Sequence, residues 1–151
     1  MTSRAMLGSF AFSSLAITGL MTGIMPAAAD GTMSMTLVER ATTDAVVDIG
    51  AKDDSAGDIL TFANEIYDET NKTAVGSDNG WCIRTVPGKA WECFWTLSLA
   101  DGQITGEGPF LDGKDSVLAV TGGTGKYKTV RGEMQLHASP VNYFQPIDGI
   151  E

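Results

Sequence analysis

The stretch from Val117 to Gly132, which reads VLAVTGGTGKYKTVRG, constrains the fold of this chain most. An apolar run over 117–120 enters a glycine-rich turn over 121–125, and a second alternating stretch leaves that turn from Lys126. Glycine adopts positive φ without a Cβ clash, and two β-rich runs joined by such a turn are typical of a hairpin. We therefore expect a β-hairpin here. A phosphate-binding loop is disfavoured, because Tyr127 stands where that motif needs Ser or Thr.

The first 29 residues have the features of a secretory signal peptide. Arg4 supplies a positive charge, residues 5–24 are apolar or small, and residues 26–29 (PAAA) end in an A-x-A cleavage pattern. Serine, threonine and glycine interrupt the apolar stretch, which disfavours the alternative of a membrane anchor. We expect cleavage before Asp30, a mature domain over 30–151 and a secreted or periplasmic location. Stable membrane insertion is not expected.

Charge and residue counts exclude several classes of function. The mature chain carries nine basic and nineteen acidic residues, a net charge of −10. Such a surface repels phosphate, so a nucleic-acid partner is not expected. One histidine (His137) and two cysteines are too few for a convincing zinc site, and no nucleophile-elbow motif accompanies the histidine. We therefore expect no metal and no cofactor.

Alternation of apolar and polar residues at period two recurs along the mature chain and predicts about eight short strands. The segments are 32–40, 43–49, 58–67, 73–86, 90–99, 103–110, the hairpin over 117–132, 133–138 and 141–144. Within 73–86, Gly76 and residues 78–80 indicate a bulge or a turn between two short strands. No helical period of useful length is present, so the class is all-β. Glycines inside strands favour a barrel, where strands must bend.

Cys82 and Cys93 flank a Pro87-Gly88 turn. If the hairpin widens symmetrically around that turn, residues whose numbers sum to 175 lie opposite each other, and the two cysteines are such a pair. Opposed residues on adjacent antiparallel strands lie within the Cα separation that a disulfide bond requires. Export to an oxidising compartment favours the bond. We therefore predict a Cys82–Cys93 disulfide.

From Gly57 to about Gly149 the chain resembles plant allene oxide cyclases and, more distantly, dirigent proteins. The matching pieces, in order, are Gly57-Asp58, Phe62-x-Asn64-x-x-Tyr67, Val75-Gly76-x-x-x-Gly80-x-Cys82, Gly102-Gln103-Ile104, Gly108-Pro109-Phe110-Leu111 and DSVLAVTGGTGKYKTVRG over 115–132. The resemblance implies an eight-stranded antiparallel β-barrel with an apolar cavity. Cyclases of this kind steer a reactive fatty-acid epoxide into a ring, and dirigent proteins steer the coupling or cyclisation of phenolic intermediates.

The resemblance also implies roles for individual residues. Phe62 matches an aromatic cavity residue, Asn64 a water-holding amide and Cys82 a pocket cysteine, while Phe110 replaces a cavity tyrosine. The family's catalytic glutamate has no counterpart, because Thr36 stands at its position. The ligand-binding residues expected from resemblance and periodicity together are Leu60, Phe62, Asn64, Cys82, Trp95 and Phe110.

Each of these candidate residues also has a purely structural interpretation. The Asn64 amide could hold a water or ligand oxygen, or it could be a satisfied structural residue. The aromatic residues could line a pocket or fill a small barrel. Arg84 could meet a ligand carboxylate at a barrel mouth, or be solvated or ion-paired. Asn64 and Glu39 are the catalytic candidates, and Glu39 would need a raised pKa and an interior position to act as a base.

Three hypotheses for the function follow. The first is a secreted cyclase or isomerase that folds a reactive hydrophobic substrate (fatty-acid-derived, polyketide or phenolic) by confinement in the barrel. The second is a dirigent-like or carrier barrel without acid–base chemistry. The third is an extracellular interaction domain whose interior is packed shut. Homo-oligomerisation is compatible with all three.

Overall fold

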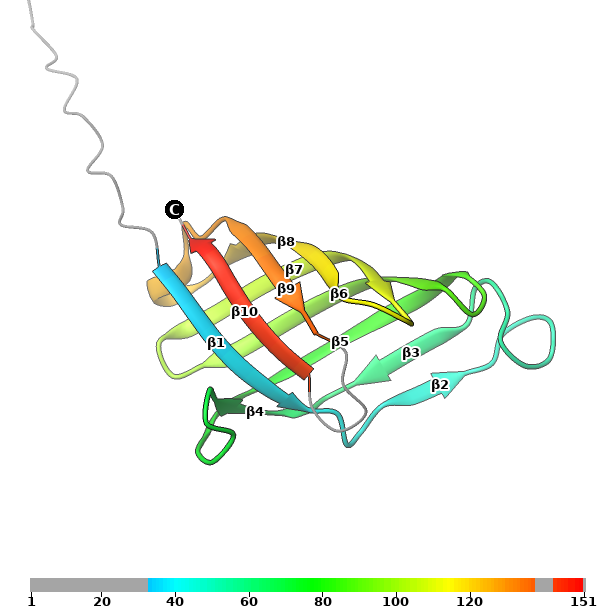
Figure 1. The fold of residues 1–151 in the computed structure, drawn as a ribbon, viewed down its shortest axis with the longest axis horizontal. Coiled ribbons are helices and arrows are strands. Elements are labelled where there is room, and N and C mark those ends of the chain that lie inside the picture. The colour runs from blue at the N-terminus through cyan, green and yellow to red at the C-terminus, as the bar shows by residue number, and fades with distance from the viewer. Residues whose placement is uncertain (1–32, 138–142, 151) are drawn as a thin grey trace, which may run out of the picture.

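The computed structural model describes residues 33–137 and 143–150, which form antiparallel strands wound into a barrel (Figure 1). The elements are β1 (Met33–Arg40), β2 (Ala45–Val47), β3 (Ile59–Phe62), β4 (Glu65–Asp68), β5 (Ala74–Val86), β6 (Ala90–Leu99), β7 (Gly102–Leu111), β8 (Ser116–Gly123), the 3-10 helix η1 (Gly125–Tyr127), β9 (Gly132–Leu136) and β10 (Tyr143–Ile150). The expected signal peptide lies outside the described residues. Within those residues, no helix has the length and hydropathy that a membrane crossing requires.

The strand pairings close into a ring. Going round, β5 pairs with β6, then β7, β8, β9, β10, β1 and β4, and β4 pairs back with β5. β3 pairs with the far half of β5 and so continues the line of β4, while β2 is added outside β3. The expected all-β, eight-stranded antiparallel barrel is therefore confirmed. The described residues form ten strands because one wall strand is divided and one short strand is added.

The divided wall strand was expected to be continuous over 58–67. It is interrupted at Ala63 and Asn64, where β3 ends and β4 has not begun. The backbone N–H of Asn64 still donates to Asp78 O at 3.0 Å, and that of Asp78 donates to Asn64 O at 2.9 Å. The interruption therefore leaves Asn64 within the barrel wall, with its side chain buried.

Of the two alternatives expected at Gly76 and residues 78–80, a bulge or a turn between two short strands, the turn is wrong, because β5 runs unbroken over 13 residues. A Cβ at Gly76 would collide with the carbonyl oxygen of Ser98. A Cβ at Gly80 would collide with the carbonyl oxygen of Phe94 and lie 2.6 Å from the Phe62 ring. These glycines allow close packing of neighbouring strands and do not form a turn. A bulge is present at the start of β5, where its register with β4 shifts.

The hairpin expected over 117–132 is present, but its connection is longer than the sequence suggested. β8 continues to Gly123, η1 follows, and β9 begins only at Gly132 and pairs back with β8. The strand expected to start at Lys126 is therefore wrong. At Gly125, φ is +58° and a Cβ would collide with the Asp101 carbonyl oxygen, so the motif packs against the β6–β7 turn instead of forming a free tight turn.

Two other segments also differ in extent from the expectation. The strand expected over 43–49 is reduced to β2, whose three residues are all exposed. The last strand, expected over 141–144, is described from Tyr143 and runs to Ile150 as β10. It joins β9 and β1, so these residues complete the barrel wall.

The predicted disulfide bond joins Cys82 on β5 to Cys93 on β6. The two residues face each other in the ladder, as the hairpin register predicted, with Cα atoms 4.0 Å apart. Both side chains are buried. The bond therefore fastens two wall strands to each other from the inner side.

The core lies inside the barrel and follows the period of two. On β6, four alternate residues from Trp91 to Leu97 are buried, whereas Glu92 is exposed. The buried apolar cluster comprises Leu37, Phe62, Ile66, Cys82, Trp91, Cys93, Trp95, Leu97, Ile104, Leu118, Val120, Tyr127, Val130, Met134 and Leu136. Leu60 and Phe110 are partly buried and pack against it. Burying such side chains contributes roughly 1.5–3 kcal/mol each.

Candidate active site

Polar side chains are also buried in this apolar interior, and three of them form one cluster. Glu39, Asn64 and Asp78 come from β1, the β3–β4 junction and β5, and their exposed fractions are 3%, 2% and 1%. Asn64 Nδ2 donates to Glu39 Oε1 at 2.7 Å, and the backbone N–H of Asn64 donates to Asp78 Oδ1 at 3.1 Å. The barrel therefore brings two carboxyl groups together around one amide.

Asn64 uses its whole hydrogen-bonding capacity within the protein. Its Oδ1 accepts bonds from the backbone N–H groups of Thr42 and Thr43 and from the Thr43 hydroxyl, at 2.9–3.0 Å. Its Nδ2 donates to Asp44 Oδ1 at 3.0 Å as well as to Glu39. An amide has two donor hydrogens and two acceptor lone pairs. This geometry fixes the loop after β1 and sets the orientation of the Glu39 carboxyl group.

The apolar interior raises the pKa values of both carboxyl groups above those of exposed carboxyl groups. Burial raises the pKa of Glu39 to about 9, and the negative charge of Asp78 adds to that shift. Burial also raises the pKa of Asp78, to about 6. The two groups are coupled, so they titrate as a pair. At neutral pH the pair therefore holds one proton, with Glu39 the protonated member.

One oxygen of this pair, Asp78 Oδ2, and one neighbouring atom, Trp95 Nε1, have no aligned hydrogen bond within the described part of the chain. The Trp95 indole lowers the pKa of Asp78, so it acts on that carboxylate although no aligned bond forms. A proton shared between the Glu39 and Asp78 carboxyl groups supplies one donor. The indole N–H remains available to a polar atom that enters the interior.

Aromatic rings cover the interior beside the carboxyl pair. The rings of Phe62 and Trp95 lie 4.9 Å apart, and Phe110 packs edge-on against Trp95 at 6.5 Å. Leu60 and Cys82 face each other across β3 and β5 next to them. All five side chains contribute to one apolar interior, so the barrel brings the expected ligand-binding residues together. Their role in ligand binding stays a prediction.

Of the alternatives considered for Arg84, the structure shows an ion-paired side chain. Its Nη1 donates to both carboxylate oxygens of Asp112 at 2.7 and 2.8 Å, and its Nε lies 2.6 Å from Asp54 Oδ1. The guanidinium carbon lies 3.8 Å from the centre of the Trp91 ring. Arg84 is 8% exposed and joins the loop before β3 to the β7–β8 turn at one mouth of the barrel.

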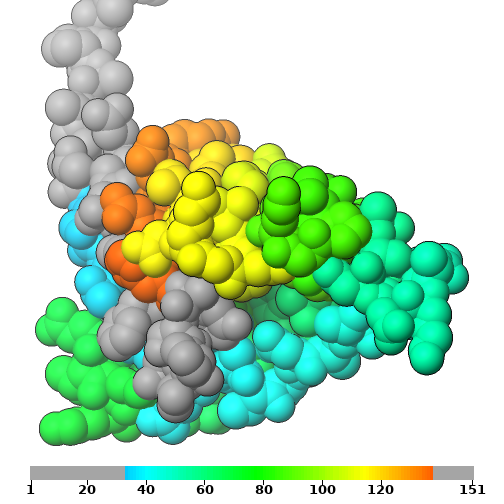
Figure 2. All heavy atoms as spheres, turned by 45° about the vertical axis from the view of Figure 1, so that its right-hand side comes forward, coloured from blue at the N-terminus to red at the C-terminus, as the bar shows by residue number. Residues whose placement is uncertain are grey.

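A hollow of about 550 Å³ opens at this mouth, lined by Val46, Asp48, Asp53, Asp54, Asp58, Arg84, Gly88, Trp91 and Asp112. In Figure 2, the surface is recessed between the cyan β2 segment and the green and yellow strands. Backbone hydrogen bonds from Ser55 and Ile49 lower the pKa of Asp58, so its carboxylate is ionised. Neither Phe62 nor Asn64 lines this hollow.

Sequence reasoning named Glu39 and Asn64 but missed Asp78. The tripeptide Asp78-Asn79-Gly80 is turn-like and indicates a bulge or a turn, which gives Asp78 no inner-face position. The period of two running back from the buried Cys82 through residue 80 would have placed Asp78 on the inner face. His137, by contrast, lies at the surface, where Nδ1 is 2.6 Å from Asp115 Oδ2.

Over the described residues, fold and site together define an antiparallel β-barrel with a carboxyl pair inside an apolar, aromatic interior. The model of the allene oxide cyclase family matches residues 34–145 of the chain. That match spans well over half of the chain, so the protein belongs to the allene oxide cyclase family.

Several solved structures are similar to this barrel. A pyocyanin demethylase shares 27% identity over 76% of this chain and 98% of its own, with a TM-score of 0.68. A pterocarpan synthase dirigent protein is 15% identical over 80% and 94% of the two chains, with a TM-score of 0.63. An exo-specific intermolecular Diels-Alderase is 18% identical over 80% and 98%, with a TM-score of 0.62. The last two show a shared fold.

Proposed function

We propose that this protein is an enzyme that binds a hydrophobic small molecule inside the barrel and catalyses its cyclisation or isomerisation. The observation that carries the proposal is the buried pair of Glu39 and Asp78, held by Asn64. Burying two carboxyl groups in an apolar interior is unfavourable unless they are paired and hydrogen-bonded. Such pairs with perturbed pKa values are concentrated at functional sites.

The two carboxyl groups have different roles in this proposal. At neutral pH, Glu39 is protonated and can donate a hydrogen bond or a proton to an oxygen or nitrogen atom of the substrate. Asp78 is largely ionised and can accept a proton or stabilise positive charge. Asn64 positions Glu39, while Phe62, Trp95 and Phe110 hold the substrate in a reactive conformation. Confinement lowers the entropic part of the barrier.

The substrate class follows from the interior. Aromatic walls with a few polar groups suit a conjugated or polycyclic molecule with one hydrogen-bond acceptor. The names of the structural neighbours support this class, since they include a pyocyanin demethylase, a dirigent protein and a Diels-Alderase. Pyocyanin is therefore one compound to test, beside allene oxides and polyenes that can cyclise.

Secretion is part of the proposal. The predicted signal peptide and the Cys82–Cys93 bond both support a secreted or periplasmic protein, since such bonds persist in oxidising compartments. Intact-mass measurement of the exported protein tests this directly. A mass that begins at Asp30 and is two hydrogens lighter than the dithiol form is expected. A mass that retains residues 1–29 would contradict it.

The activity is tested by incubating the mature protein with this panel of compounds and quantifying products by mass spectrometry. Glu39→Gln keeps the shape of the side chain and removes its acidic proton, so it should lower turnover by roughly 10²–10⁴-fold, the usual contribution of general acid catalysis. Glu92→Gln, at an exposed position on β6, is the matched control and should be unaffected.

The runner-up is a dirigent-like or carrier barrel that binds the same molecules without acid–base chemistry. It predicts that Glu39→Gln leaves product ratios unchanged, whereas substitution of Phe62 by Ala alters binding. A packed-shut interaction domain predicts that none of the compounds binds.

A further inference from the structure

Trp95 Nε1 and Asp78 Oδ2 are a hydrogen-bond donor and a hydrogen-bond acceptor that lie next to each other in the interior. Trp95 is 5% exposed and Asp78 is 1% exposed. Neither atom forms an aligned hydrogen bond within the described part of the chain. Buried polar atoms in native proteins are nearly always satisfied, so such an exception calls for a water molecule or a ligand.

The strand register explains why the two side chains are neighbours. Trp95 on β6 pairs with Gly80 on β5, and Asp78 lies two residues before Gly80 on the same inner face. Asp78 and Trp95 are therefore diagonal neighbours, a separation that an aromatic side chain can span. Gly80 places no side chain between them. The indole lowers the pKa of Asp78, against the larger raising effect of burial, so the two groups interact although they are not aligned.

Aromatic contacts hold the indole in place. The Phe62 ring lies 4.9 Å from the Trp95 ring, and the Phe110 ring meets it edge-on at 6.5 Å. On its other neighbour, β7, Trp95 pairs with Gly106, where an added Cβ would lie 3.4 Å from the methyl group of Met134. The indole N–H is therefore a donor whose position is set before any ligand binds, which reduces the entropic cost of binding.

Asp78 has acceptor capacity left. An ionised carboxylate offers about four lone-pair positions. The backbone N–H of Asn64 donates to Oδ1 at 3.1 Å, and the proton shared with Glu39 occupies a second position. Asp44, the other charged group that acts on Asp78, is negative and supplies no donor. A further donor at Oδ2 would form a charge-assisted bond, which is stronger than a bond between neutral groups.

We infer that Trp95 and Asp78 together bind a hydroxyl group of the substrate. The hydroxyl oxygen accepts a hydrogen bond from Trp95 Nε1–H, and the hydroxyl hydrogen is donated to Asp78 Oδ2. A hydroxyl group is a donor and an acceptor at one atom, so it satisfies both groups. A carbonyl oxygen satisfies only the indole and places its lone pairs against the carboxylate.

This inference rests on the proposed function, because it requires the substrate to enter the barrel. It adds the chemical group by which the substrate is recognised, so the preferred class becomes conjugated or polycyclic alcohols. The bound hydroxyl group would lie beside Glu39, because Glu39 and Trp95 both border the Asp78 carboxyl group.

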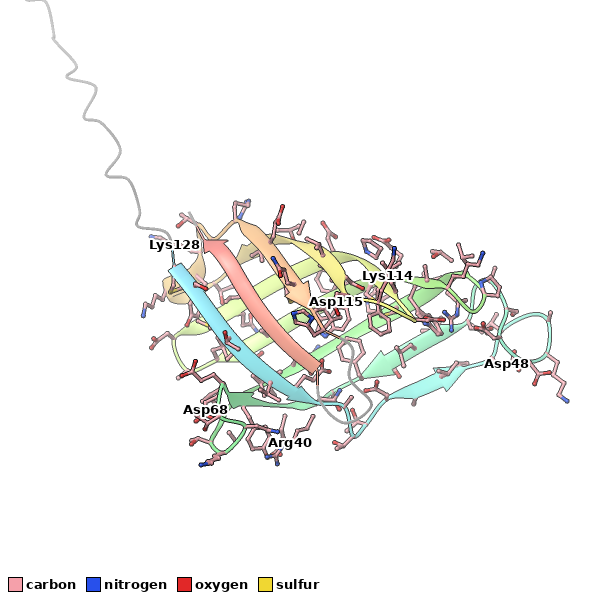
Figure 3. The ribbon with its side chains drawn as sticks, in the orientation of Figure 1. Arg40, Asp48, Asp68, Lys114, Asp115 and Lys128 are labelled. Carbon is pink, nitrogen blue, oxygen red and sulfur yellow. A yellow bond between two sulfur atoms is a disulfide. The ribbon has the colours of Figure 1, made fainter. Side chains whose placement is uncertain are left out.

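Arg84 is a second buried donor, but it is already engaged. It is ion-paired with Asp54 and Asp112. It lines the hollow at the barrel mouth together with Asp48, which Figure 3 shows at one end of the barrel. Neither member of the proposed hydroxyl site lines that hollow. The hydroxyl site is therefore separate from the mouth and belongs to the interior.

The test compares three tricyclic compounds of similar shape: 9-fluorenol, 9-fluorenone and fluorene. Equilibrium dialysis against the mature protein measures the affinity of each. 9-Fluorenol should bind about 10- to 100-fold more tightly than fluorene, and 9-fluorenone should not share this advantage. Trp95→Phe keeps an aromatic ring and should reduce the advantage about 3- to 10-fold, as expected for one hydrogen bond. Asp78→Asn removes the charge and should reduce it by a similar factor, about 3- to 10-fold.

Trp81→Phe is the matched control, because Trp81 is 44% exposed on the outer face of β5. This variant should keep the full advantage of 9-fluorenol. Nuclear magnetic resonance of the wild type adds a measurement that needs no variant to bind ligand. The chain has three tryptophans, so it gives three indole N–H signals, which the variants assign. The Trp95 signal should move downfield with 9-fluorenol relative to fluorene, and the Trp81 signal should stay in place.

Equal affinity of the wild type for 9-fluorenol and fluorene would overturn the inference, and a water molecule held between Trp95 and Asp78 would give that result. The proposed function would survive it, because both compounds would still bind. An undiminished advantage of 9-fluorenol in Trp95→Phe would also overturn the inference. Binding of none of the three compounds would overturn both proposals. A preference for 9-fluorenol without turnover of any substrate would support the hydroxyl site and contradict only the proposed reaction.

Discussion

Asn64 Nδ2 donates a hydrogen bond of 2.7 Å to Glu39 Oε1, inside a barrel where both side chains are at most 3% exposed. A bond to that oxygen leaves Oε2 as the atom of Glu39 that can carry the proton. Asn64 is itself held by Thr42, Thr43 and Asp44, so the direction of the Glu39 carboxyl group is set by the loop that follows β1. This bond therefore gives the buried Glu39 carboxyl group one fixed orientation toward the interior of the barrel.

Protein stability should depend on pH through Glu39. Its pKa is raised from 4.5 to about 9 on folding, so between these values the unfolded chain binds fewer protons than the folded one. The free energy of unfolding therefore falls as pH rises through this window. Glu39→Gln removes the contribution of Glu39 to this dependence, and we expect the stability of the variant relative to wild type to rise by about 2–4 kcal/mol between pH 5 and pH 9.

Urea unfolding of both proteins at several pH values measures this difference. Glu92→Gln is the control, because that side chain is exposed. A difference between Glu39→Gln and wild type that is constant across the range would show that Glu39 is ionised in the folded state as it is in the unfolded one.

Asn64→Ala should destabilise the fold and expose the pair to solvent. It removes the acceptor used by the backbone N–H groups of Thr42 and Thr43, and the donor used by Glu39. Unsatisfied buried groups cost about 1–3 kcal/mol each, so we expect a loss of about 2–4 kcal/mol. Hydrogen exchange should rise first at residues 42–44. An unchanged exchange rate there would mean that Asn64 does not fix this loop.

Much of the fold could be predicted because it depends on local pattern. The period of two along β6 identified its inner face, and the Pro87-Gly88 turn fixed the register that opposes Cys82 and Cys93. Both signals need only neighbouring residues. The extent of β5 could not be predicted in this way. Its glycines are required by the close approach of Phe62, Phe94 and Ser98, which lie on other strands.

The site was predicted only in part for the same reason. Glu39 and Asn64 could be named, but the pKa of Glu39 depends on how deeply the ring of strands buries it and on Asp78. These partners are separated by 39 residues along the chain. Most hydrogen-bond partners of the Asn64 side chain likewise lie in the loop over 42–44, and no local sequence pattern predicts the conformation of that loop.

Reduction of the Cys82–Cys93 bond should lower stability without unfolding the barrel. The closed loop is short, with a sequence separation of 11, so the expected loss is about 2–3 kcal/mol. Thermal unfolding with and without reductant, on the wild type and on the Cys82→Ala/Cys93→Ala double variant, measures it. The double variant should not respond to reductant. Loss of β-structure on reduction alone would contradict the expectation that the strand ladder and core maintain the fold.

Gly80→Ala should be among the most destabilising single-methyl substitutions in this chain. Gly80 pairs with Phe62 on β3 and with Trp95 on β6, so it lies beneath the closest aromatic contact in the interior. The added Cβ would lie 2.6 Å from the Phe62 ring and collide with the Phe94 carbonyl oxygen, so the ring or a strand must move. Overpacking of this kind costs about 1–3 kcal/mol or more. Gly113→Ala is the matched control, because a Cβ there meets nothing within 4 Å. Denaturant unfolding of the two variants should separate them by at least about 1 kcal/mol, and the fluorescence of Trp95 should change only in Gly80→Ala. Equal stability of the two variants would mean that Phe62 can move aside freely, and the aromatic wall would then be too loose to hold a substrate in one conformation.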